Sequence, residues 1–107
     1  MNQKRIPRIE RKMDRIKEQL KRIGAMRPGS LTRQFKDPER KVGAYWQISY
    51  TRRMKSRTEY VRKECVTRVR REIVAYKRFK RLVDQWIDLS IEHSQLTMRI
   101  AQPRTTR

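Results

Sequence analysis

The sequence contains few of the residues from which metal sites, disulfides and phosphate-binding loops are built. Among 107 residues there are one cysteine, Cys65, one histidine, His93, and three isolated glycines. A single cysteine excludes an internal disulfide and fits a reducing compartment, and one cysteine with one histidine cannot form a local zinc motif. A glycine-rich phosphate loop is also missing. We therefore expect no metal, no cofactor and no small-molecule substrate.

Long hydrophobic runs and acidic residues are scarce as well. No stretch approaches the roughly 20 apolar residues that a membrane span needs, and the first residues are charged throughout, unlike a secretory signal. Eleven Asp and Glu stand against 30 Lys and Arg, so the formal net charge is +19 and the pI is near 11.3. We expect a cytoplasmic, nucleoid-associated protein with no membrane partner.

The excess of basic charge indicates a polyanionic partner. Self-repulsion at this level destabilises a compact chain, whereas bound phosphates relieve it and release counterions. The charge therefore predicts a nucleic-acid-binding protein, with DNA favoured over RNA. Two alternatives stay open: an RNA-binding protein of a ribonucleoprotein, and a helical assembly protein whose basic charge is incidental.

Catalytic patterns are weak by comparison. His93 lies in a helical run without a second histidine or cysteine nearby, and Cys65 has no histidine partner in the sequence. Asp84, Asp88 and Glu92 share one helix face, where a salt-bridge role is expected rather than a divalent cation. We predict that the protein is not an enzyme.

Apolar spacing predicts a helix on either side of the centre. A seam with alternating steps of three and four residues predicts an amphipathic helix over 1–24, with Gly24 at its end: Ile6, Ile9, Met13, Ile16, Leu20 and Ile23. A second stripe predicts a long helix over 64–101, followed by a basic tail over 102–107: Val66, Val69, Ile73, Tyr76, Phe79, Val83, Trp86 or Ile87, Leu96 and Ile100.

Charge reverses within the long helix. Residues 82–98 contain no Lys or Arg and three acids. This acidic stretch is expected to pair with the basic first helix, either within the chain or in a homodimer or partner complex.

The centre of the chain, 25–63, predicts a β-hairpin or a three-stranded antiparallel sheet. Residues 42–50 alternate, with Trp46 and Ile48 on one face, and a second strand follows at 55–61. A three-residue loop would place Trp46 opposite Tyr60 and Ile48 opposite Thr58. The fold class is thus α+β, in a single domain.

In that register the polar face of the hairpin carries Gln47, Ser49, Arg57 and Glu59. Gln47, Ser49 and Arg57 are predicted to read base edges, with surrounding cations on phosphates, and Tyr45 would stack on a single-stranded target. The full set of predicted nucleic-acid-binding residues is Gln47, Ser49, Arg52, Arg53, Lys55, Arg57, Arg62, Lys63, Arg68, Arg70, Arg71, Lys77, Arg78, Lys80 and Arg81.

Four short motifs stand in the central region: RPGSL at 27–31, YWQISY at 45–50, RTEYV at 57–61 and YKRF at 76–79. Together they resemble a family of small uncharacterised bacterial proteins associated with transposons and insertion sequences, over about residues 15–90. The resemblance implies a role beside a mobile element. Many relatives carry a cysteine cluster where residues 34–41 here have none, so no metal site is implied. Three short strands and a helix are also similar, in architecture alone, to the arm-type DNA-binding domains of phage integrases.

Overall fold

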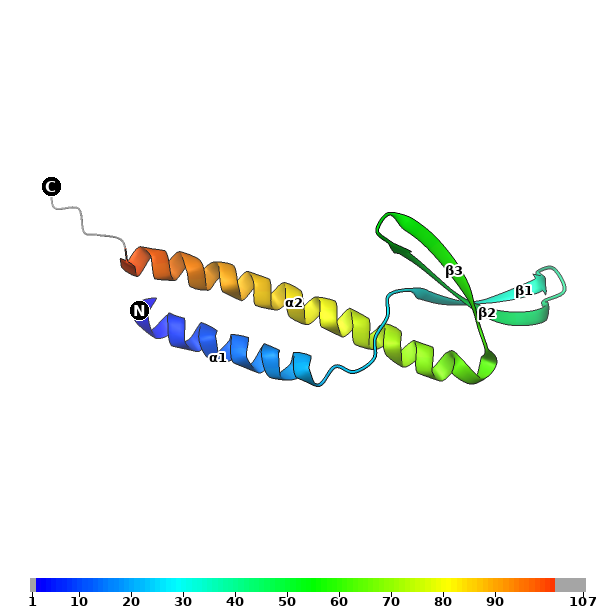
Figure 1. Ribbon diagram of the computed structural model, residues 1–107, viewed down its shortest axis with the longest axis horizontal. Helices are drawn as coiled ribbons and strands as arrows, with labels where there is room; N and C mark the ends of the chain where they lie inside the picture. Colours follow the sequence, from blue (N-terminus) through cyan, green and yellow to red (C-terminus); the bar gives the residue numbers. More distant parts are fainter. Residues whose placement is uncertain (1, 102–107) are drawn as a thin grey trace. The chain divides into compact units, whose positions relative to one another are not determined.

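The computed structural model describes residues 2–101 and confirms the α+β class, with an N-terminal helix, a three-stranded antiparallel sheet and a long C-terminal helix (Figure 1). In chain order the elements are α1 (Asn2–Lys21), β1 (Ser30–Asp37), β2 (Val42–Arg52), β3 (Lys55–Val61), a short 3-10 helix (Lys63–Cys65) and α2 (Val66–Ala101). Among the helices of these residues, none is both long enough and apolar enough to span a membrane. The elements form two compact units: a helical unit of residues 2–23 and 79–101, and a sheet unit of residues 24–78.

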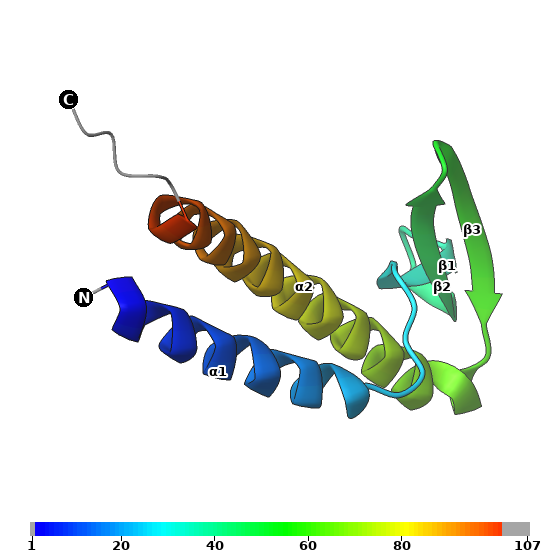
Figure 2. The same cartoon turned by 60° about the vertical axis from the view of Figure 1, so that its left-hand side comes forward.

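In the helical unit, α1 runs antiparallel beside the C-terminal part of α2 (Figures 1 and 2). Ile9 and Ile16 of α1 are buried, and so are Leu82 and Leu96 of α2. Within each pair the spacing is a multiple of seven residues, as in a heptad seam. The stripe predicted for α2 included Val83, but Leu82 is the buried residue. Each helix has a single narrow seam, so the unit is held by little buried surface.

Polar contacts between α1 and α2 match the charge reversal. Arg5 forms an ion pair with Glu92, and His93 Nε2 lies 3.0 Å from Glu10 Oε2. The Lys17 ammonium lies 5.3 Å from the centre of the Trp86 ring. The basic first helix therefore pairs with the acidic stretch, as the charges indicated. The pairing lies within one chain, which is one of the alternatives that the sequence left open.

In the sheet unit, one face of the sheet packs on the first turns of α2. Ile48 of β2 is fully buried in a cluster with Val61 of β3 and with Val69 and Ile73 of α2. Leu31, Trp46 and Val66 pack around this cluster. We call this side of the sheet the inner face.

The register of β2 and β3 differs from the predicted one. Trp46 pairs with Val61 rather than Tyr60, and Ile48 pairs with Glu59 rather than Thr58. A slip of one residue turns every side chain of a strand to the other face. Val61 is consequently buried, whereas Tyr60 is 70% exposed.

A two-residue turn, Arg53-Met54, joins β2 and β3 in place of the predicted three-residue loop. Both residues have positive φ, 53° and 67°, which is the signature of a type I′ turn. Asn-Gly is the preferred sequence for this turn because other side chains are strained there. The packing of Val61 and Ile48 on α2 outweighs that local strain.

The inner face also explains the position of one polar residue upstream of β1, Arg27. The Arg27 guanidinium donates to Glu59 at 2.6 Å and lies 5.1 Å from the centre of the Tyr50 ring. Its backbone N–H donates to the Glu72 carbonyl of α2 at 3.2 Å. Arg27 thus compensates the carboxylate that the register brings to the inner face.

Candidate nucleic-acid interface

The face of the sheet that points away from α2 is polar over all three strands. Side chains alternate between the two faces of a strand, so the observed pairing defines this outer face. Its composition includes no acidic residue and one basic residue: Ser30, Thr32, Gln34, Lys36, Tyr45, Gln47, Ser49, Thr51, Ser56, Thr58 and Tyr60. An acid-free surface of hydroxyls, amides and two tyrosines, with Lys36 as its one charged side chain, is therefore presented to solvent.

Cross-strand hydrogen bonds order the hydroxyl groups of the outer face. Ser49 Oγ lies 3.2 Å from Thr58 Oγ1, and Thr51 Oγ1 lies 3.0 Å from Ser56 Oγ. These pairs sit directly opposite one another on β2 and β3. Gln47 follows in the same row, opposite Tyr60. Each hydroxyl keeps further donor or acceptor capacity toward solvent.

Exposed cations lie at both ends of the outer face. At the β2–β3 turn are Arg52, Arg53 and Lys55, and none of them forms an ion pair within residues 2–101. At the opposite end, where β3 runs into the start of α2 (Figure 2), are Arg62 and Lys63. The β1–β2 turn adds Arg40 and Lys41 near this second end. The sheet unit carries sixteen Lys and Arg against five Asp and Glu.

Three of those five acids are occupied by neighbouring arginines. Glu59 pairs with Arg27, and Glu72 of α2 lies 3.4 Å from Arg68. Asp37 lies 3.8 Å from Arg40. Little negative charge is left to oppose the exposed cations.

The predicted residues of α2 lie on different faces of the helix. Arg70 lies 5.2 Å from the centre of the Trp46 ring, and Lys77, seven residues on, shares its side of α2. Arg71 and Arg78 share another side, which is not the side packed on the sheet. The first half of α2 is therefore basic around much of its circumference, without one continuous row.

Three of the predicted residues, Arg57, Lys80 and Arg81, differ in placement from the rest of the set. Arg57 belongs to the inner face, opposite Tyr50, so the prediction that it joins Gln47 and Ser49 on the reading face is wrong. The cause is the one-residue shift in register. Lys80 and Arg81 are exposed but belong to the helical unit, unlike the other thirteen residues of the set.

Sequence reasoning missed a hollow at the end of β3. It has a volume of about 380 Å³ and is lined by Arg33, Ala44, Tyr45, Trp46, Tyr60, Val61 and Lys63. It forms where β3 ends at Val61 while β2 continues back to Val42. Three aromatic side chains and two cations line this hollow, a combination that suits a nucleobase with its phosphate. The alternation of Tyr45 and Trp46 and the end of the strand at residue 61 were predicted from the sequence. The register that turns Tyr60 to the same face as Tyr45 was not.

Metal binding finds no support in the described residues. Within 2–101, no three His, Cys, Asp or Glu side chains come together as a metal site. Glu92, one of the three acids within residues 82–98, is instead paired with Arg5. Cys65 is exposed at the end of the 3-10 helix.

Comparison with protein-family models, with curated proteins and with solved structures found no significant match for this chain.

Proposed function

We propose that the protein is a non-enzymatic DNA-binding protein whose sheet lies against duplex DNA with its outer face toward the bases. The observation that carries this proposal is the acid-free outer face of hydroxyl and amide side chains with exposed Lys and Arg at both ends. The major groove admits a β-ribbon, and base edges there are read by amide and hydroxyl side chains. Gln47 and Ser49 are the central readers in this arrangement.

Cations at the two ends of the face would hold phosphates. Arg52, Arg53 and Lys55 bind the backbone on one side, and Arg62 and Lys63 bind it on the other. Phosphate contacts fix orientation, while contacts to the bases supply specificity. The proposal therefore requires phosphate-binding cations at the ends of the outer face and base-reading polar side chains at its centre, which is how these residues are distributed.

A second candidate is binding of single-stranded nucleic acid, RNA included. The hollow at the end of β3 favours it, because Tyr45 and Tyr60 line that hollow together with Arg33 and Lys63. Stacking of one base on an aromatic side chain contributes about 1–3 kcal/mol. In this case the tyrosines, rather than Gln47, carry affinity.

Fluorescence anisotropy across a salt series tests the proposal, with a 20-bp duplex, a 20-nucleotide single strand and an RNA stem-loop as probes. The variant is the triple change R52A/R53A/K55A. If each side chain neutralises one phosphate, the slope of log K against log salt falls by about 2.7 for the duplex. Affinity at moderate salt should fall by about ten-fold to a hundred-fold.

The matched control removes the same charge elsewhere. Arg8, Arg11 and Lys12 are exposed on α1, and their triple alanine variant also lowers the net charge by three. An equal loss of affinity in both variants would reduce the binding to bulk charge and refute the sheet interface. Absence of salt-dependent binding to all three probes refutes nucleic-acid binding itself.

Tyr60→Ala separates the two candidates. Under duplex binding its effect on duplex affinity is less than about three-fold, since the base edges are read by Gln47 and Ser49. A loss of ten-fold or more on the single strand, together with weak duplex binding by the unmodified chain, selects the second candidate. The resemblance noted above adds the further proposal that the nucleic acid belongs to a mobile element, for which the protein is an accessory factor.

A further inference from the structure

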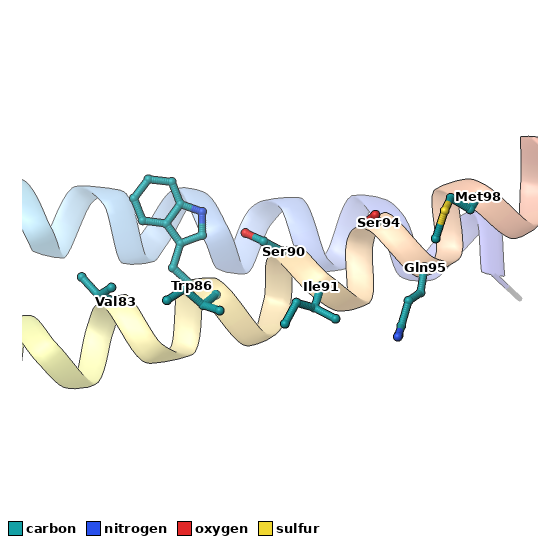
Figure 3. Close-up of a pocket in the computed structure, with 8 residues that line it drawn as sticks. Val83, Trp86, Ser90, Ile91, Ser94, Gln95 and Met98 are labelled. Carbon is teal, nitrogen blue, oxygen red and sulfur yellow. The ribbon is translucent and has the colours of Figure 1, made fainter.

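The C-terminal part of α2 carries an exposed apolar stripe beside the seam that contacts α1. Ile87, Ile91 and Met98 are 50%, 53% and 62% exposed. They line one shallow groove together with Val83, Trp86, Ser90, Ser94 and Gln95 (Figure 3). We call these eight residues the α2 stripe. Contiguous exposed apolar surface of this kind marks an interaction site in a soluble protein.

The α2 stripe differs in charge from the rest of the chain. Residues 82–98 contain no Lys or Arg, whereas α1 contains eight Lys and Arg against three acids. Asp84 and Asp88 lie along the stripe, one residue beyond Val83 and Ile87. A chain of net charge +19 repels its own copies almost everywhere, but this stretch attracts a basic helix.

Among the described residues of the helical unit, the same stripe is the surface through which a second copy of the chain supplies a matching apolar groove. Along residues 4–21 of α1 no large hydrophobic side chain is exposed, so α1 has no apolar face to offer. An interface in which each partner uses the same patch is isologous and closes as a two-fold dimer. The basic α1 of each copy can then approach the acids that border the other copy's stripe.

We propose that two chains associate through the α2 stripe into a four-helix bundle, with the two α2 helices antiparallel. A parallel pair would place Asp84 beside Asp84 and Asp88 beside Asp88. An antiparallel pair centred between Ser90 and Ile91 instead places Asp84 level with Thr97 of the second copy. Ser90 and Ser94 leave room for the larger side chains of the opposite stripe, as holes do for knobs. This inference does not depend on nucleic-acid binding.

Sedimentation equilibrium of the full chain without nucleic acid tests the dimer. The unmodified chain is expected to dimerise at micromolar concentration, and I87Q/I91Q should raise the dimer dissociation constant at least about a hundred-fold. Val74→Gln is the control, because Val74 is an exposed apolar residue of α2 outside the stripe. Circular dichroism at high protein concentration checks that both variants remain helical.

A monomer for the unmodified chain at roughly 100 µM overturns the proposal. A dimer that survives I87Q/I91Q, or that V74Q disrupts equally, also overturns it. Since nucleic acid is absent, these outcomes leave the proposed function untouched.

Disulfide trapping tests the direction of the helices in a Cys65→Ser background. Antiparallel helices place the two copies of residue 90 within about one 1.5 Å rise of each other along the axis, so S90C crosslinks on mild oxidation. Met98→Cys does not, because its two copies are about 20 Å apart. Crosslinking of M98C, or failure of S90C in a dimer, contradicts the antiparallel arrangement.

Discussion

Gly29 occupies a position where any side chain would be strained and crowded, and Gly29→Ala is the most direct test of the sheet unit. Its φ is +143°, outside the regions that side-chain-bearing residues adopt. A Cβ there would lie 2.6 Å from both Cγ1 and Cδ1 of Ile48, the fully buried residue of the cluster. Backbone strain costs about 1–3 kcal/mol and overpacking about 1–3 kcal/mol more. We expect Gly29→Ala to destabilise the sheet unit by about 2–6 kcal/mol.

The chain provides a matched control in Gly24→Ala. A Cβ at Gly24 meets nothing within 4 Å. The unfolded chain loses conformational freedom on this change, so stability should be unchanged or rise by up to about 1 kcal/mol. Each unit contains one tryptophan, Trp46 in the sheet unit and Trp86 in the helical unit. Urea unfolding followed by fluorescence in a Trp86→Phe background therefore reports on the sheet unit.

Ile48→Val in the Gly29→Ala background separates crowding from backbone strain. It removes the Cδ1 methyl, one of the two atoms that the new Cβ would meet. The destabilisation by Gly29→Ala should be smaller by about 1 kcal/mol in that background. This reduction is within the roughly 1–3 kcal/mol assigned to overpacking. Equal effects of Gly29→Ala and Gly24→Ala would refute the whole argument, and an undiminished cost in the Ile48→Val background would refute its steric half.

Three further predictions follow from single contacts. A double-mutant cycle of Arg27→Ala and Glu59→Gln should give a coupling energy of about 1 kcal/mol in urea unfolding; a value near zero means that this ion pair does not support the register. Replacing Arg53-Met54 with Asn-Gly should stabilise the hairpin by about 1–2 kcal/mol, because both residues have positive φ; a lower melting temperature would contradict the type I′ turn. Leu82→Ala should destabilise the helical unit by about 2–5 kcal/mol, measured by Trp86 fluorescence; a loss below about 0.5 kcal/mol would mean that Leu82 is not in the seam.

The helices and their pairing were predictable because periodicity and charge agree. The seam of α1 repeats every seven residues, and its buried residues Ile9 and Ile16 belong to the predicted stripe. Opposite charge on residues 82–98 indicated the partner of α1. The choice of Leu82 over Val83 was not predictable, since adjacent apolar residues fit the same spacing until the partner helix selects one.

The strand register was not predictable from local pattern. Polarity favoured an arrangement with Arg57 and Glu59 facing solvent and Tyr60 inside. Two long-range contacts favour the observed register instead. Val61 packs into the cluster on α2, and Arg27, 32 residues earlier in the sequence, neutralises Glu59. Contacts so far apart in sequence leave no trace in strand alternation.

In the candidate interface, the residues of β2 lie on the predicted face, whereas those of β3 lie on the opposite face from the predicted one. Gln47 and Ser49 were placed correctly on the outer face because they lie on β2, whose burial the apolar alternation determined. Arg57 lies on β3 and moved to the inner face with the register. Tyr60 moved in the opposite direction and lies exposed on the outer face.

Both proposals concern the stability of this chain, which buries few apolar side chains and has a net charge of +19 that opposes folding. Burial of an aliphatic side chain contributes about 1.5–3 kcal/mol, while ordering each residue's backbone costs about 1–2 kcal/mol. A ligand at a hundred times its dissociation constant adds about 2.7 kcal/mol, as much as one buried side chain. DNA would act on the sheet unit and a second copy on the helical unit, so the two contributions are separable by tryptophan. Among the described residues, the buried apolar side chains that stabilise the two units are Ile9, Ile16, Ile48, Val61, Val69, Ile73, Leu82 and Leu96.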